Sequence, residues 1–149
     1  MIYFRQLFDK PSSTYTYLLG DMTRHEAMLI DPVREHVALY HALLEEQNLT
    51  LCSVLETSVH ADHITGASAL RTATGAQTVV NIHGCAPCAT GHVAGGETLH
   101  FGAETVAVLA TPGHPPAIPR LPQLSVARPP VQRRRAAHRW LRGHRFSRR

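Results

Sequence analysis

Residues 51–66 read LCSVLETSVHADHITG, and this stretch both indicates the fold and contains the candidate chemistry. It opens with an apolar run at 51–55, which predicts a buried β-strand. A polar segment with two histidines follows and leads into residues 64–74, where apolar side chains recur at helical spacing before Gly75. A buried strand, a polar loop and a helix in this order are typical of α/β chains, which place reactive groups on loops at the ends of strands.

The residues on either side of this stretch extend the α/β pattern. Clusters of β-forming residues are separated by turns rich in proline, serine and glycine, and one long segment has apolar residues at three- and four-residue steps. We therefore expect strands at 2–8, 14–19, 27–30, 77–82, 98–101 and 105–109, and an amphipathic helix at 35–47.

Potential metal ligands gather in the polar loop, where His60, Asp62 and His63 lie within four residues. Neutral imidazole and carboxylate are donors that zinc, iron and manganese accept without a thiolate. His114 follows another expected strand, in a turn whose proline and glycine allow a sharp reversal. These four residues are a candidate metal site. The alternative is that they are solvated polar residues in a chain that contains 11 histidines.

The net charge of +4 combines two stretches of very different composition. Five basic and eleven acidic residues give residues 1–114 a charge of −6, whereas residues 115–149 contain ten arginines and no acid. Residues 115–149 also hold six of the ten prolines and have no sustained apolar period, so we expect this tail to be disordered. One hypothesis is that the tail results from a frameshift after His114. Contact with RNA or anionic lipid is the less favoured alternative.

The three cysteines do not suggest a disulfide framework. Cys52, Cys85 and Cys88 are too few and too unevenly spaced, which fits a reducing compartment. The CxxC pattern of Cys85 and Cys88 can bind zinc or act in redox chemistry, but a single such pair is a weak signal. A run of about 18 apolar residues is absent, as is the order of charges typical of a signal peptide, so we expect a cytoplasmic protein without a membrane span.

The motifs resemble those of a known family. ETSVHADHITGA at 56–67 resembles the T-H-x-H-x-D-H motif of the metallo-β-lactamase superfamily, and LATPGH at 109–114 resembles its next metal-binding turn. Together with RQLFD, STYTYLL and LIDPV, these motifs are most similar to those of persulfide dioxygenases. Glyoxalase II hydrolases are the nearest relatives of that group. The resemblance implies an αββα sandwich, of which residues 1–114 form about the first half. An apolar sheet face left uncovered would then favour aggregation or a molten state.

The resemblance also implies roles for individual residues. In persulfide dioxygenases one iron (Fe²⁺) is held by the first histidine of the motif, by the histidine that matches His114, and by a later aspartate. This chain has Ser58 at the first position and no counterpart of that aspartate after His114. In the two-metal hydrolases, the residues that match His60 and His114 share one metal, and those that match Asp62 and His63 hold the other. We take Asp62 as the candidate catalytic residue.

Three functions remain open at this point. The first is a metal-dependent, persulfide dioxygenase-like protein that acts on glutathione persulfide, a small thiol substrate, with activity impaired by Ser58. The second is a glyoxalase II-like zinc hydrolase of glutathione thioesters. The third is a non-catalytic fragment. Nucleic acid is not an expected partner, because the basic charge is confined to the tail.

Overall fold

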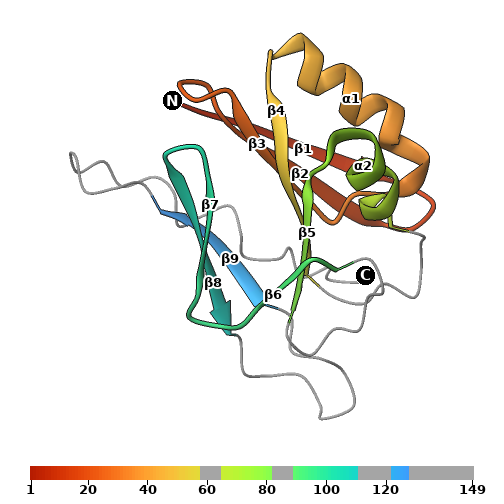
Figure 1. Ribbon diagram of the computed structural model, residues 1–149. Helices are drawn as coiled ribbons and strands as arrows, with labels where there is room; N and C mark the ends of the chain where they lie inside the picture. The colour runs from red at the N-terminus through yellow and green to blue at the C-terminus, as the bar shows by residue number, and fades with distance from the viewer. Residues whose placement is uncertain (58–64, 82–88, 111–121, 128–149) are drawn as a thin grey trace, which may run out of the picture.

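The computed structural model describes residues 1–57, 65–81, 89–110 and 122–127, which form two β-sheets and their covering helices (Figure 1). The first sheet has the strand order β1-β2-β3-β4-β5-β6, and the second has the order β7-β8-β9. Strands of the first sheet are β1 (Ile2–Asp9), β2 (Thr14–Asp21), β3 (Glu26–Ile30), β4 (Thr50–Glu56), β5 (Gln77–Asn81) and β6 (Gly91–Val93). Those of the second are β7 (Thr98–Phe101), β8 (Glu104–Ala110) and β9 (Pro122–Ala127).

Strand pairing in the first sheet changes from antiparallel to parallel at β3. The pairs β1–β2 and β2–β3 are antiparallel, whereas β3–β4, β4–β5 and β5–β6 are parallel. The 3₁₀-helix η1 (Arg34–His36) and helix α1 (Val37–Glu46) connect β3 to β4, and helix α2 (Ala67–Thr74) precedes β5. Because these strands are parallel, the chain leaves β3, β4 and β5 at one edge of the sheet, where parallel sheets usually carry their sites.

Each helix begins and ends for a local reason. Helix α1 buries Tyr40, Leu43 and Leu44, which recur at three- and four-residue spacing on one face. Helix α2 ends at Gly75, whose φ of 75° suits glycine and whose N–H donates to Arg71 O at 2.8 Å. The predicted helices are therefore confirmed, with α2 starting three residues later than expected. Among the described residues, no helix is long and apolar enough to cross a membrane.

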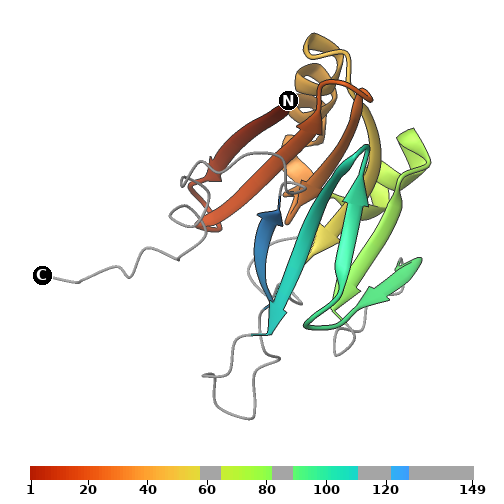
Figure 2. The ribbon, with the colours of Figure 1, turned by 90° about the vertical axis from the view of Figure 1, so that its left-hand side faces the viewer.

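The first sheet lies between the helices and the second sheet (Figure 2). It separates two cores, one on each face. Successive side chains of a strand point to opposite faces, so Leu18 packs with the helices while Leu19 packs with the second sheet. Leu29 and Met28 divide in the same way on β3. The result is a layer of helices, a mixed sheet and a second sheet.

The second sheet is attached to the first by two carboxylates. Asp21 Oδ2 accepts a hydrogen bond from Ala103 N at 2.8 Å, and Glu26 Oε2 accepts one from Gly102 N at 2.8 Å. The Ala103 N–H is also the main reason that the pKa of Asp21 lies below its usual value. Gly102 has a φ of 60°, and a Cβ there would lie 2.5 Å from Asp21 Oδ2, so this contact requires glycine.

The exposed apolar face expected from the sequence is only partly present. The second sheet covers Leu19, Met28 and Leu55, whereas Phe4 and Phe8 near the β1 edge are 46% and 49% exposed. These two rings contact neighbouring tyrosines of β2. Aggregation or a molten state of the chain stays a prediction.

Strand β9 lies within the range expected to be a disordered tail. Residues 122–127 pair with β8 along their whole length, from Ala110↔Pro122 to Thr105↔Ala127, so the expectation of disorder is wrong for these six residues. The alternation in QLSV was obscured by the surrounding proline and arginine, and pairing with β8 satisfies backbone groups that an edge would expose. The remaining residues of 115–149 lie outside the described part. The boundary at 114 and the frameshift both stay hypotheses.

Candidate functional site

The candidate ligands lie outside the residues that the structure describes. They are in the ranges 58–64 and 111–121, so the metal site stays a prediction. The residues concerned are Ser58, His60, Asp62, His63 and His114, and the CxxC cysteines Cys85 and Cys88 fall in a third such range. Among the described residues, no group of three or more His, Cys, Asp or Glu side chains could hold a metal ion.

The structure does describe both flanks of the 58–64 segment. Strand β4 ends with Glu56, which is 4% exposed, and the described chain resumes at Thr65 before α2. The Thr65 hydroxyl donates a hydrogen bond to Glu56 Oε1 and accepts one from Ala67 N at 3.1 Å. The two flanks are therefore hydrogen-bonded to each other, and the second is also bonded to the start of α2.

The first flank is held by Asp31, just past the end of β3. Its carboxylate accepts hydrogen bonds from Thr57 N at 2.7 Å and from Thr57 Oγ1 at 2.5 Å. Its own N–H donates to Leu55 O at 2.9 Å. Asp31 has a φ of 50°, a left-handed conformation that aspartate tolerates better than most residues because its short side chain bonds locally. Asp31 thus fixes the residue that immediately precedes the candidate ligands.

The second flank is held by the residues that follow Asp31. Pro32 O accepts a hydrogen bond from Gly66 N at 2.7 Å, and Val33 forms an isolated antiparallel bridge with Thr65. A Cβ on Gly66 would lie 3.3 Å from Val33 O, so the close approach of these two backbones favours glycine. Residues 31–33, which we call the anchor turn, therefore contact both flanks of the segment.

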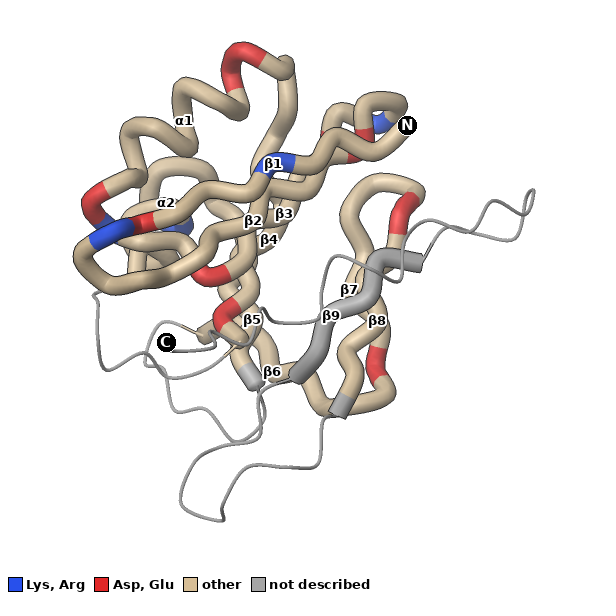
Figure 3. Tube along the Cα trace, turned by 180° about the vertical axis from the view of Figure 1, so that it is seen from behind, with Lys and Arg blue, Asp and Glu red and all other residues tan. Residues whose placement is uncertain are grey.

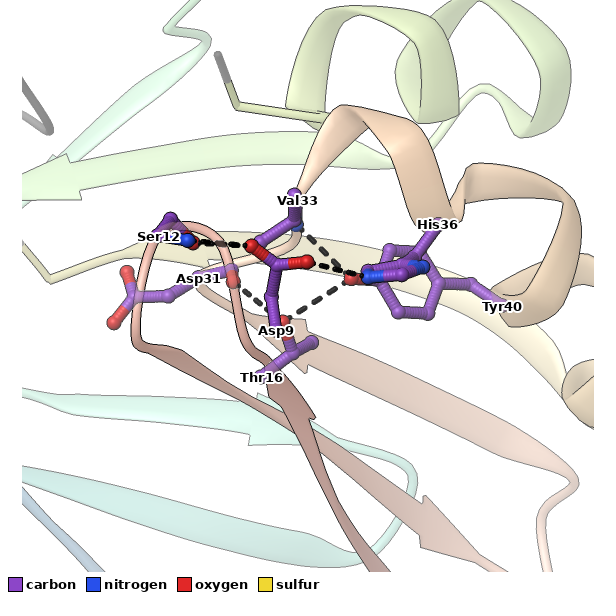
Figure 4. Close-up of polar contacts among 7 residues, drawn as sticks. All are labelled: Asp9, Ser12, Thr16, Asp31, Val33, His36 and Tyr40. Carbon is purple, nitrogen blue, oxygen red and sulfur yellow. Dashed lines mark hydrogen bonds and ion pairs between the residues drawn. The ribbon is translucent and has the colours of Figure 1, made fainter. Parts of the chain in front are cut away.

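Two buried hydroxyls form hydrogen bonds with the anchor turn (Figure 4). Val33 N donates to the Tyr40 hydroxyl at 3.0 Å, and Thr16 Oγ1 donates to Asp31 O at 2.8 Å. The two hydroxyl oxygens are 3.1 Å apart. Since the Thr16 proton is used on Asp31 O, Tyr40 is the donor between them. Burial is the main reason that the pKa of Tyr40 is raised, which keeps its hydroxyl protonated as this chain requires. We call Tyr40 and Thr16 the hydroxyl relay.

A second aspartate, Asp9, lies beside the relay in Figure 4. It accepts hydrogen bonds from Ser12 N at 3.0 Å and Ser12 Oγ at 2.5 Å, and His36 Nε2 lies 2.8 Å from its other oxygen. The Ser12 contacts are the largest cause of a pKa for Asp9 below its usual value. This cluster fixes the β1–β2 turn against η1, next to the start of α1.

Sequence reasoning did not select the anchor turn or the relay. The strings STYTYLL and LIDPV contributed to the expected strands and to the family likeness, but Thr16 and Asp31 within them were given no role in the site. Strand β2 also contains Thr14, so its sequence gave no signal that distinguishes Thr16. On the wider molecule, basic residues are few along the described chain, as the composition predicts (Figure 3).

Comparison with known families and structures places this fold. The family model described as the Metallo-beta-lactamase superfamily matches residues 9–138. The crystal structure of ETHE1 from Myxococcus xanthus is 46% identical, with a TM-score of 0.73, and the match covers 84% of this chain and 53% of that one. A metallo-beta-lactamase structure from Staphylococcus aureus is 28% identical, with a TM-score of 0.74, covering 85% of this chain and 38% of that one.

Two kinds of curated enzyme are similar in sequence. The mitochondrial persulfide dioxygenase ETHE1 of Bos taurus is 42% identical over 113 residues, which cover 75% of this chain and 44% of that protein. A hydroxyacylglutathione hydrolase of Cereibacter sphaeroides is 33% identical over 106 residues, which cover 69% of this chain and 40% of that protein. The chain spans less than half the length of these curated relatives, and its sheets match part of the two-sheet fold. It belongs to the metallo-beta-lactamase superfamily.

Proposed function

We propose that this chain is a metal-dependent protein of the persulfide dioxygenase type, acting on glutathione persulfide with reduced or no activity. The observation that carries the proposal is the 42% identity over 113 residues to a persulfide dioxygenase. A match of that length in a chain of 149 residues must include the central segment 58–64. Because the chain spans 44% of that relative, the relative's whole activity is transferred here only as part of the proposal.

The donor set suits the expected metal. Of the ligands that the family likeness expects for iron, His114 is present, and His60, Asp62 and His63 would add nitrogen and oxygen donors of the kinds that iron and zinc accept. When bound, iron would supply positive charge and open coordination positions for the oxidation. The role of the described residues is positional. The hydrogen bond from Thr57 to Asp31 fixes the start of the ligand-bearing segment, and the hydrogen bond from Gly66 to Pro32 fixes its end.

Ser58 is the reason that we propose reduced activity. The net reaction converts a persulfide, dioxygen and water into sulfite and a thiol. Ser58 stands where the family likeness expects a histidine, and a neutral hydroxyl is a much weaker ligand than imidazole for a divalent metal. We therefore expect metal binding with little turnover.

The direct test measures metal binding and oxygen uptake on the full chain. We expect titration with Fe²⁺ or Zn²⁺ to show binding, and oxygen uptake with glutathione persulfide and Fe²⁺ to be far below that of an intact relative. Absence of binding by either metal would refute the metal site. Turnover equal to that of the relative would refute the role given to Ser58.

Ser58→His provides a sharper version of the same test. The variant should bind metal more tightly, because an imidazole replaces a hydroxyl in the ligand set. It should still turn over slowly, since residues 115–149 contain no acidic side chain that could serve as the later aspartate of the family. Recovery of full activity would mean that another residue of the chain supplies that ligand.

Hydrolysis of a glutathione thioester on zinc is the second candidate. It is favoured by the 33% identity to a hydroxyacylglutathione hydrolase. Two bound zinc ions and hydrolysis of S-lactoylglutathione would favour it, and iron with oxygen uptake would favour the first proposal. Metal binding without either activity would indicate a non-catalytic fragment.

A cytoplasmic location is part of our proposal, although the persulfide dioxygenase of Bos taurus is named as mitochondrial. Fractionation of the source cells would distinguish the two locations.

A further inference from the structure

The hydroxyl relay has a place in the fold that suggests more than support of the core. We propose that Tyr40 and Thr16 are positioning residues for the 58–64 segment, acting through the anchor turn that holds both of its flanks. The inference rests on the proposed function in that this segment is taken to carry the metal ligands. It adds one residue from α1 and one from β2, whose hydroxyls bond to the anchor turn and to each other.

The anchor turn is the common point of attachment for both flanks. Asp31 bonds to Thr57 on one side, and Pro32 bonds to Gly66 on the other. A displacement of the turn therefore moves both ends of the segment together. Since Thr57 and Gly66 lie outside the segment by only one and two residues, there is little chain to absorb the displacement.

The turn depends on the relay for two backbone hydrogen bonds. Val33 is 1% exposed and Asp31 is 9% exposed, so water has little access to replace the partners of Val33 N and Asp31 O. A buried N–H or C=O without a partner costs more than the bond itself contributes, because its desolvation is not compensated. Asp31 also adopts a left-handed conformation that its surroundings must maintain.

The relay fixes the turn to two rigid elements at once. Tyr40 is completely buried within α1, and Thr16 is 2% exposed within β2. The direction of each hydrogen bond is determined, from Val33 N to Tyr40, from Tyr40 to Thr16, and from Thr16 to Asp31 O. Side chains held by packing on helices and strands position a site more closely than loop residues do. Loss of groups that orient metal ligands typically lowers metal affinity by about 10- to 100-fold.

Two isosteric variants remove the relay. Tyr40→Phe deletes the hydroxyl that accepts from Val33 N, and Thr16→Val deletes the hydroxyl that donates to Asp31 O. Thr16→Ser keeps that hydroxyl and serves as the conservative rescue. If Tyr40→Phe does not fold, Thr16→Val tests the same relay with a smaller change.

Thr90→Val is the control for loss of a threonine hydroxyl, because the Thr90 hydroxyl also bridges a backbone N–H and a backbone C=O, at an exposed position outside the relay. It accepts from Thr78 N at 2.9 Å and donates to Thr78 O at 3.1 Å. This pair joins β5 to the residue before β6 and makes no hydrogen bond to the anchor turn.

The experiment measures two quantities on the full chain. Titration with Zn²⁺ alone gives the metal Kd, and amide hydrogen exchange of the metal-free protein compares Thr57 and Gly66 with the core amides of Leu18 and Leu29. We expect Tyr40→Phe and Thr16→Val to raise the Kd about 10-fold. They should also accelerate exchange at Thr57 and Gly66 well above the core amides, whereas Thr16→Ser and Thr90→Val should not.

The outcomes separate this inference from the proposed function. Uniform acceleration of all amides would mean that the relay only stabilises the core, and this would overturn the inference. A Kd equal to that of the Thr90→Val control would do the same. If the unsubstituted chain binds no Zn²⁺ while exchange changes only at Thr57 and Gly66, the metal proposal fails and the positioning of the segment stands.

Discussion

Asp9 and Asp31 form the same pair of hydrogen bonds in two regions of the molecule. Each lies where a strand ends, and each carboxylate accepts a backbone N–H and a hydroxyl from one residue, Ser12 or Thr57. The Asp9 contact spans three residues inside one turn, whereas the Asp31 contact spans 26 residues and joins the end of β3 to the end of β4. The same two kinds of donor thus stabilise a turn in one region and determine the path of the chain in the other.

The difference lies in what each contact constrains. A contact over three residues restricts a turn that the β1–β2 hairpin already closes. A contact over 26 residues fixes the position at which the chain leaves the sheet toward the candidate ligands, and closing so long a loop carries a larger entropy cost. Substitutions at Asp31 and Thr57 should therefore affect both stability and metal binding, and those at Ser12 only stability.

Asp31→Ala should have the largest effect. It removes two hydrogen bonds to a carboxylate and places alanine at a φ of 50°, which alanine adopts with strain. We expect a loss of about 3 kcal/mol in the free energy of unfolding, measured by urea titration at neutral pH. A loss below about 1 kcal/mol would contradict the role assigned to this carboxylate.

Asp31→Asn is the control for backbone strain. Asparagine tolerates the left-handed conformation and keeps one oxygen acceptor for Thr57, so it should lose less stability than alanine. Equal losses in the two variants would mean that the charge of the carboxylate is the main contribution.

Thr57→Val and Ser12→Ala compare the two regions directly. Each variant removes one hydroxyl donor and leaves the backbone N–H that bonds to the same carboxylate. We expect Thr57→Val to cost about 1.5 kcal/mol in unfolding free energy and to raise the Zn²⁺ Kd several-fold. Ser12→Ala should cost less and leave the Kd unchanged. Equal changes in Kd would show that the span of the contact is irrelevant to metal binding.

Local signals in the sequence predicted most of the regular structure. The three- and four-residue spacing of Tyr40, Leu43 and Leu44 indicated α1, and Gly75 indicated the end of α2. The signals failed where strands were short or masked by composition. Strand β6 has three residues, and β9 lies in a stretch dominated by proline and arginine. Such strands are determined by pairing with a neighbour, which a single sequence does not display.

The candidate site also has a part that the sequence indicated and a part that it did not. The grouping of His60, Asp62 and His63 could be read directly, because metal ligands have characteristic types and spacing. The relay could not, since Tyr40 and Thr16 are 24 residues apart and look like ordinary core and strand residues until the fold brings their hydroxyls together. Groups that position a site therefore leave a weaker trace in a sequence than the groups that do its chemistry.

The smallest expected effect concerns the pH dependence of the Asp9 region. Hydrogen bonds from Ser12, and then the nearby His36, hold the pKa of Asp9 below its ordinary value of 3.8 in the folded chain. Protonation is therefore easier in the unfolded state, so this contribution to stability is complete above that ordinary value and is lost as the pH falls through the lowered pKa.

Unfolding measured between about pH 5 and pH 2 tests this expectation. Ser12→Ala removes a major part of the shift, and Asp9→Asn removes the titrating group itself. Both variants should flatten the decline of unfolding free energy at low pH relative to the unsubstituted chain. An unchanged slope in both would mean that Asp9 contributes nothing to acid sensitivity, and that its contact, unlike that of Asp31, has no measurable energetic consequence beyond the shape of the turn.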